Sequence, residues 1–187
     1  MRSRSCLPAL LVVALALGGC TGSTGEVVDR PPSAALPGPV PKGVTFVAPP
    51  TNAPRAPGFT LELLDGTVLD MTEQWDRRPV VLVFLEPWCT LCAEQQREIN
   101  QLVEDYRDVI LFVGVGADST ADRMRQYVRD NEVKHPVGID ATGQIWRKYR
   151  VEEPPLVALV TKGGKLLRGW PGGTDTLRAQ LNDLVTR

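Results

Sequence analysis

Two cysteines three positions apart, Cys89 and Cys92, are the residues of this chain best suited to chemistry. They end the segment Glu86-Pro87-Trp88-Cys89-Thr90-Leu91-Cys92, which follows an apolar run and opens a helical apolar pattern. At the start of a helix, unpaired backbone N–H groups and the helix dipole stabilise a thiolate, the form of cysteine that attacks disulfides. We therefore expect Cys89 to be the nucleophile and Cys92, one helical turn on, to be the resolving thiol that closes a disulfide with it.

Three other uses of this pair compete with redox exchange. A purely structural disulfide is disfavoured because so short a loop gives little chain-entropy stabilisation. A zinc site needs four ligands, whereas the sequence has no second cysteine pair and His135, an expected loop residue before Pro136, is its one histidine. A Cu(I)-carrying metallochaperone remains the alternative, since soft thiolates suit Cu(I). The redox reading requires no metal and no organic cofactor.

The first 19 residues have the layout of a secretory signal peptide. Arg2 and Arg4 precede an apolar stretch, Leu7–Leu17, that is too short for a permanent membrane span of about 20 residues. Leu17-Gly18-Gly19-Cys20 also resembles the bacterial lipobox, which implies lipid on Cys20 and cleavage before it; the alternative is a plain signal peptide. We expect a protein held at the cell membrane on its extracytoplasmic face, where disulfides persist and only Cys89 and Cys92 remain as thiols.

Length and charge set the broad class. The 187 residues suit one domain with appendages, and 21 basic against 22 acidic residues form no stripe that would bind nucleic acid. Residues 20–56 are rich in proline and lack an apolar period, so they are expected to be a semi-rigid tether that cannot fold alone. Residues 57–187 are expected to be the folded domain, acting as a monomer.

Strand and helix patterns alternate along that domain. Residues 59–63 alternate with period two and turn at Asp65-Gly66 into Val68-Leu69, which predicts a hairpin. Further strands are expected at 80–85, 110–115 and near Val137, with helices at 89–106, at 120–131 capped by Ser119, and at 145–149. A second hairpin, 156–160 and 165–170 through Gly163-Gly164, precedes a last helix at 175–185. This order predicts an α/β fold, a mixed central sheet with helices on both faces.

The segment Trp88-Cys89-Thr90-Leu91-Cys92 after an apolar strand resembles the active site of the thioredoxin superfamily. The similarity is closer to secreted thioredoxin-like proteins of the TlpA, ResA and DsbE type, and residues 140–151 resemble their segment ahead of a cis-proline. The resemblance implies a thioredoxin-like fold and a thiol–disulfide oxidoreductase, with Pro155 as the cis-proline and a substrate groove shaped by Trp88, Pro154 and Pro155. Implied partners are exported protein thiols or disulfides and a membrane electron donor or acceptor.

The sequence also departs from these families. Val83 stands where thioredoxins carry a buried Asp, and Gln95 stands where ResA-like proteins carry a Glu, so the usual proton acceptor for Cys92 is missing. Glu86, Glu94 and Glu98 are the candidates to replace it, and Glu86 is the one closest to the strand end. The Thr90-Leu91 dipeptide leaves the direction of electron flow open, between a reductase for cytochrome c maturation and an oxidase. The Pro-x-x-x-Thr-x-x-Cys pattern of peroxiredoxins is absent.

Overall fold

The computed structural model describes residues 36–171, 174 and 176–186. The predicted signal peptide and Cys20 lie outside these residues. The strands are β1 Thr45–Phe46, β2 Thr60–Glu62, β3 Val68–Asp70, β4 Val80–Phe84, β5 Leu111–Gly116, β6 Val137–Ile139, β7 Leu156–Val160, β8 Leu166–Pro171 and β9 Val185–Thr186. The helices are α1 Met71–Arg77, α2 Thr90–Asp105, α3 Ala121–Asp130, α4 Gln144–Tyr149 and α5 Leu177–Leu184.

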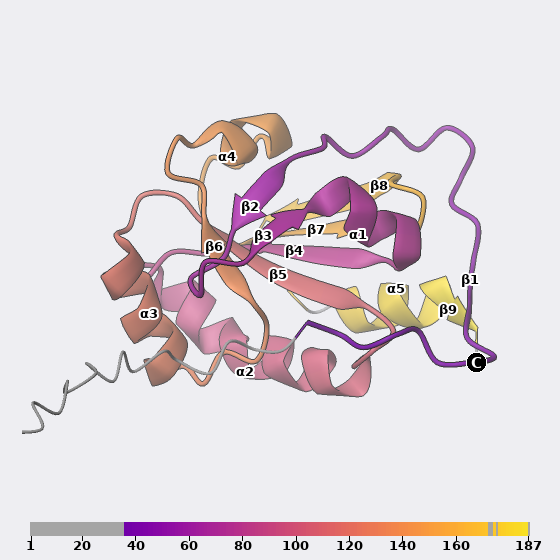
Figure 1. Cartoon of the computed structure of the whole chain (residues 1–187), viewed down its shortest axis with the longest axis horizontal. Coiled ribbons are helices and arrows are strands. Elements are labelled where there is room, and N and C mark those ends of the chain that lie inside the picture. The colour runs from indigo at the N-terminus through magenta and orange to yellow at the C-terminus, as the bar shows by residue number, and fades with distance from the viewer. Residues whose placement is uncertain (1–35, 172–173, 175, 187) are drawn as a thin grey trace, which may run out of the picture.

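A five-stranded mixed sheet in the order β6-β5-β4-β7-β8 forms the centre of the molecule (Figure 1). β4, β5 and β6 are parallel, whereas β7 runs antiparallel to β4 and β8 antiparallel to β7. In the register of β4 and β7, Phe84 lies opposite Leu156. The carboxyl end of β4, which leads to Cys89, therefore adjoins the start of β7, which Pro154 and Pro155 precede.

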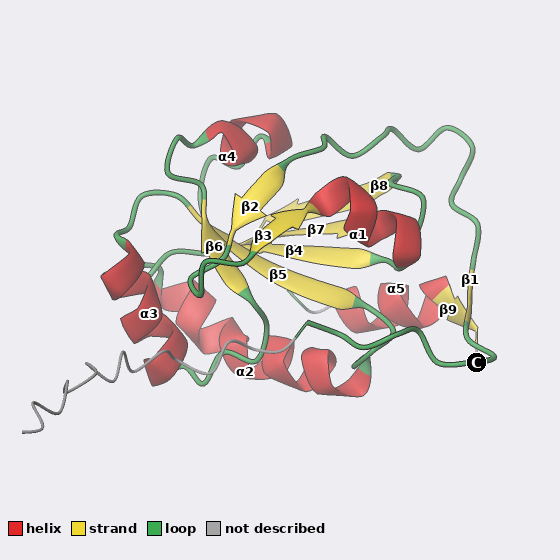
Figure 2. Cartoon of the chain, in the orientation of Figure 1, coloured by secondary structure: helices red, strands yellow, loops and turns green. Residues whose placement is uncertain are grey.

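Helices cover both faces of this sheet, as the alternation of elements predicts (Figure 2). One core cluster joins alternate residues of β4, such as Val81 and Val83, to apolar side chains of α2, α3 and α5. The other joins Val80, Leu82 and Phe84 to α1, α4 and the β2–β3 hairpin. All five residues of β4 are buried because each face of the strand has its own covering layer. The predicted α/β fold, a mixed central sheet with helices on both faces, is confirmed.

Two elements differ from the expectations. Helix α1 had no predicted counterpart, although its N-cap signal is present: the Asp70 side chain accepts a hydrogen bond from Thr72 N at 2.8 Å. The cap of α3 is Thr120 rather than Ser119, and its side chain accepts from Arg123 N at 3.4 Å. Ser119 donates its hydroxyl to Glu86 instead.

The latter part of the expected tether, residues 36–56, lies along the domain. β1 pairs antiparallel with β9, joining Phe46 to Val185, and Val47 N donates to Leu184 O at 2.9 Å. Further on, Ala56 N donates to Gly164 O at 2.9 Å. A proline-rich segment has no core of its own, but its backbone groups find partners on a domain that is already folded. Residues 36–56 are therefore in contact with the folded domain along their described length.

No helix among residues 36–171 and 176–186 combines the length and the apolar character that crossing a bilayer requires.

Candidate functional site

Cys89 and Cys92 form a disulfide at the carboxyl end of β4, with Cα atoms 5.2 Å apart. Cys89 is the N-cap residue of α2, and its sulfur accepts a hydrogen bond from Cys92 N at 3.0 Å. This N–H is one of the helix donors that have no intrahelical partner, so the helix start supplies a hydrogen bond and a positive dipole end to Cys89 Sγ. The arrangement stabilises negative charge on Cys89, which is the predicted nucleophile.

The disulfide is nearly covered while its neighbours are open to solvent. Cys89 is 6% exposed and Cys92 is 3% exposed, whereas Trp88 is 57% and Leu91 is 43% exposed. Two large apolar side chains exposed side by side next to a reactive group favour a contact surface at this place. Trp88, predicted to shape the groove, therefore offers an apolar surface directly beside the sulfurs.

The Pro154–Pro155 peptide bond is cis, in agreement with the resemblance. Pro155 is buried and Pro154 is half-buried. Because Phe84 pairs with Leu156, this turn lies at the same end of the sheet as the segment from Glu86 to Cys89. The structure therefore brings Trp88, Pro154 and Pro155 to the sheet end that carries the disulfide.

Glu86 is fully buried, and its carboxylate accepts hydrogen bonds from the loop after β5. Oε1 accepts from the backbone N–H groups of Ala117 and of Asp118, the latter at 2.8 Å, and Oε2 accepts from Ser119 Oγ at 2.5 Å. Both oxygens thus hold the loop at residues 117–119 in place. Because both carboxylate oxygens already accept hydrogen bonds from this loop, Glu86 stabilises the structure here, and its predicted use as a proton acceptor is not favoured.

Replacing Glu86 separates the two roles. We expect Glu86→Gln to keep the rate of disulfide exchange within about threefold, because an amide oxygen still accepts the two backbone N–H bonds and Ser119 can accept from the amide. Glu86→Ala should lower the free energy of unfolding by about 3 kcal/mol, since it leaves buried donors unpaired. Thermal unfolding and exchange rates from pH 5 to 9 measure both effects. A Glu86→Gln protein that is stable but loses the pH dependence of exchange would restore the acid–base role.

A buried polar network that begins one helical turn after Cys92 was not predicted. Gln96, four residues after Cys92 on α2, is 1% exposed and donates from Nε2 to Asn100 Oδ1 at 2.9 Å. The same nitrogen lies 3.3 Å from His135 Nε2. Asn100 links the network to the loop before β6, since its Oδ1 accepts from Lys134 N at 3.0 Å. The available signal was two polar residues four positions apart on the apolar stripe of α2, which predicts a shared partner in the core.

His135 belongs to the core of this network and is not an ordinary loop residue. It is 2% exposed, and its Nδ1 lies 3.2 Å from Pro136 O. This pairing assigns the proton to Nδ1 and leaves Nε2 to accept from Gln96. Burial lowers the pKa of His135 from 6.5 to about 4. Gly114 of β5 makes room for the ring, because a Cβ there would meet His135 Cε1 at 3.0 Å.

Comparison with known proteins points to one group. The AhpC/TSA family matches residues 53–169. Thiol-disulfide oxidoreductase ResA of Bacillus thuringiensis is 28% identical over 134 residues, which are 71% of this chain and 76% of that protein. The soluble secreted antigen MPT53 of Mycobacterium tuberculosis is 29% identical over 119 residues, 60% of this chain and 68% of that protein.

Solved structures share the fold, so the predicted thioredoxin-like architecture is confirmed. A secreted Mycobacterium tuberculosis disulfide oxidoreductase homologous to Escherichia coli DsbE superposes with a TM-score of 0.60 and 24% identity, over 66% of this chain and 94% of that one. The exposed lipoprotein thioredoxin Etrx1 of Streptococcus pneumoniae superposes with a TM-score of 0.61 and 24% identity. The match covers 68% of this chain and 100% of that one.

Proposed function

Because the chain belongs to the AhpC/TSA family and is a thiol–disulfide oxidoreductase, we propose that it exchanges disulfides with exported proteins through Cys89 and Cys92. The observation that carries this proposal is the disulfide at the start of α2, with Cys89 Sγ accepting the N–H of Cys92. Names of similar proteins include "secreted antigen" and "exposed lipoprotein", which supports an extracytoplasmic site of action.

The exchange balances in two steps. The Cys89 thiolate attacks one sulfur of a substrate disulfide, forming a mixed disulfide and releasing one substrate thiolate. Cys92 loses its proton and attacks Cys89 Sγ, which closes the Cys89–Cys92 disulfide and releases the second substrate thiolate. Two electrons pass to the substrate, and the reverse sequence oxidises a substrate dithiol. A membrane electron donor or acceptor would return the pair to its working state.

The reduction potential of the Cys89–Cys92 couple tests the proposal and its direction together. Equilibrating the protein with glutathione buffers of known potential and counting thiols by mass gives the value. A potential near −270 mV, about that of thioredoxin, supports a reductase, whereas one near −120 mV supports an oxidase. Failure of the protein to accelerate exchange with a disulfide-bonded protein substrate in either direction would contradict the proposal.

We further propose that Cys20 carries a lipid that holds the protein at the membrane. The support is Leu17-Gly18-Gly19 directly before it. Cys20→Ala should move the protein from the membrane fraction to the soluble fraction or block removal of residues 1–19, as fractionation and mass measurement would show. Ser23→Ala, three residues downstream, is the matched control and should leave both unchanged. Normal cleavage with retained membrane binding in Cys20→Ala would contradict lipidation.

The groove residues supply a prediction about substrate binding. A peptide lying along the turn as an added strand uses backbone N–H and C=O groups, and Pro154 has no N–H to give. We propose that the groove holds substrates loosely for this reason. In a Cys92→Ser background, which stalls the mixed disulfide, Pro154→Thr should raise the amount of trapped partner several-fold, because one hydrogen bond is worth about 0.5–1.5 kcal/mol. Non-reducing gels quantify the adduct.

The control for this experiment is Glu153→Thr, which changes the exposed neighbour of Pro154 without adding a backbone donor. It should leave trapping unchanged. Equal or weaker trapping by Pro154→Thr, in a protein that unfolds at the parent temperature, would refute loose binding while leaving the redox function intact.

A further inference from the structure

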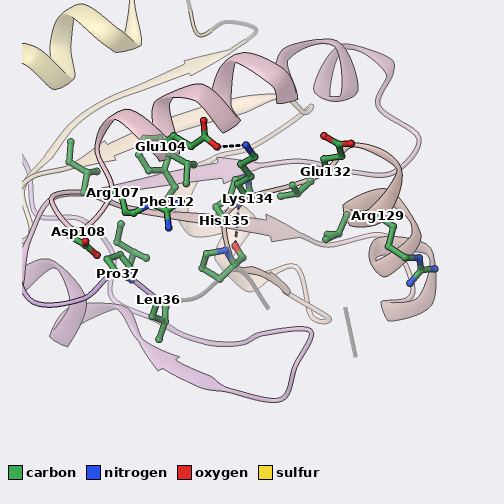
Figure 3. A pocket seen from close by; sticks show the side chains of 16 residues that line it. Leu36, Pro37, Glu104, Arg107, Asp108, Phe112, Arg129, Glu132, Lys134 and His135 are labelled. Atoms are coloured by element: carbon green, nitrogen blue, oxygen red, sulfur yellow. Dashed lines mark hydrogen bonds and ion pairs between the residues drawn. The ribbon is translucent and has the colours of Figure 1, made fainter. Parts of the chain in front are cut away.

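A cavity of about 730 Å³ lies beneath the second half of α2, between that helix, the start of β5 and the loop before β6 (Figure 3). Its volume falls in the range of roughly 300–1,000 Å³ that binding pockets occupy. Val103 and Glu104 on its wall are fourteen and fifteen residues from Cys89 along α2. At 1.5 Å per residue that is about 20 Å from the disulfide, so the cavity is separate from the redox site.

The wall is apolar at its base and carries charges of both signs at its rim. Val103, Ile110, Phe112 and Val133 provide the apolar surface. The rim carries Glu104, Arg107, Asp108, Arg129, Glu132 and Lys134. Glu104 and Lys134 pair with each other. The exposed side chains of Arg107 and Glu132 are placed to meet an occupant that also carries both signs of charge (Figure 3).

The chain itself enters the described structure at this cavity. Leu36 and Pro37 line one side of it (Figure 3). Gly38 is fixed directly behind them: Arg78 Nη2 donates to Gly38 O at 2.5 Å, and Gly38 N donates to Asp108 Oδ1 at 2.7 Å. The guanidinium is itself held by Asp108 O at 2.7 Å, and Arg78 is 6% exposed. A buried anchor therefore holds Leu36 and Pro37, the first two described residues, at the cavity.

We propose that this cavity is the docking site of residues 26–35 of the same chain, Glu-Val-Val-Asp-Arg-Pro-Pro-Ser-Ala-Ala. Val27 and Val28 supply apolar side chains for the base, while Asp29 and Arg30 offer opposite charges to Arg107 and Glu132. Val28 is eight residues from Leu36, a reach of up to about 26 Å, which spans the cavity. Because the segment is attached at the mouth, its effective concentration is in the millimolar range, so modest contacts suffice.

His135 is a built-in reporter, since it lines the cavity and is the single histidine of the chain. The test uses the chain from residue 20 with Cys20→Ser and records the His135 ring signals by NMR, together with amide hydrogen exchange. Val27→Asp with Val28→Asp should shift the ring signals and speed exchange of the cavity-lining amides at least roughly tenfold, because the loss of even one buried valine predicts that much. Ser23→Asp with Thr24→Asp adds the same charge upstream and should change neither.

Identical His135 signals and exchange rates in the parent and the Val27→Asp, Val28→Asp protein would overturn the proposal. Signals that change on dilution of the parent would also overturn it, because they would assign the cavity to a second copy of the chain. Both readouts are independent of Cys89 and Cys92, so disulfide exchange can fail while docking holds, and the reverse.

Discussion

Cys89→Ser will abolish catalysed disulfide exchange, whereas Cys92→Ser will stop it within a single turnover. A serine at position 89 cannot form a disulfide and offers no thiolate at the start of α2. With Cys92→Ser, Cys89 still attacks and releases one equivalent of substrate thiol, but no second thiol resolves the mixed disulfide, so the reaction stops after this first half of one turnover. Stopped-flow release of a chromogenic thiol gives the burst, and intact mass gives the adduct at Cys89.

Thr90→Ser is the matched control for both variants. Thr90 is exposed and lies between the cysteines, so this change keeps the loop length and both sulfurs. Turnover should stay within about twofold of the parent. The assignment rests on geometry, because Cys89 and Cys92 are similarly buried and only Cys89 caps the helix. An adduct at Cys92 in Cys89→Ser, with none at Cys89 in Cys92→Ser, would reverse the two roles.

Stability should fall as the pH drops below 6.5, and His135 should account for much of that fall. Burial lowers the pKa of His135 to about 4, whereas the unfolded chain binds a proton near 6.5. Between these values the unfolded state is protonated at this position and the native state is not, so acid favours unfolding. The stability that His135 gives is fully present above pH 6.5. By pH 4 up to about 3 kcal/mol of it should be lost.

Urea unfolding of the parent and of His135→Gln at several pH values from 7 to 4 measures this contribution. The variant loses packing and is expected to be less stable at pH 7, but its stability should vary less across the window. Carboxylates titrate in both proteins and cancel in the difference. If the two proteins lose stability in parallel from pH 6.5 to 4, His135 binds a proton equally well in the folded and unfolded states, and this prediction is wrong.

Local sequence patterns predict the parts of this fold that repeat a period or carry a turn. The β2–β3 hairpin follows from Asp65-Gly66, where Gly66 adopts φ 86° and Thr67 N bonds Asp65 Oδ1 at 2.9 Å. The apolar spacing of residues 89–106 predicts helix α2. The apolar run before Cys89 predicts a strand, which places the cysteine pair at the strand-to-helix junction. Pro155 was found through a family resemblance, because no local pattern in Glu153-Pro154-Pro155 requires a cis bond.

The features of the fold and site that the sequence did not predict depend on contacts between residues distant in sequence. Glu86 is tied to a loop 31 to 33 residues away, which no pattern around Glu86 indicates. The pair of two-residue strands β1 and β9 joins the first and last described segments, and each is too short to carry a period. Helix α1 has a cap but only two buried residues, Met71 and Trp75, so its apolar pattern is weak. Tertiary contact, and not local propensity, forms these features.

The anchor at Gly38 determines where a pulling force would enter the domain. Tension applied from the N-terminal side meets the bonds of Arg78 and Asp108 to Gly38, and then the β1–β9 pair that joins the two ends of the fold. Arg78 lies two residues before β4 and Asp108 three residues after α2, so the load enters at the end of β4 and α2 that is farther from Cys89. A force on the chain before Gly38 would therefore act at the end of β4 and α2 opposite the disulfide, and the separation of Cys89 from Cys92 would stay the same under load.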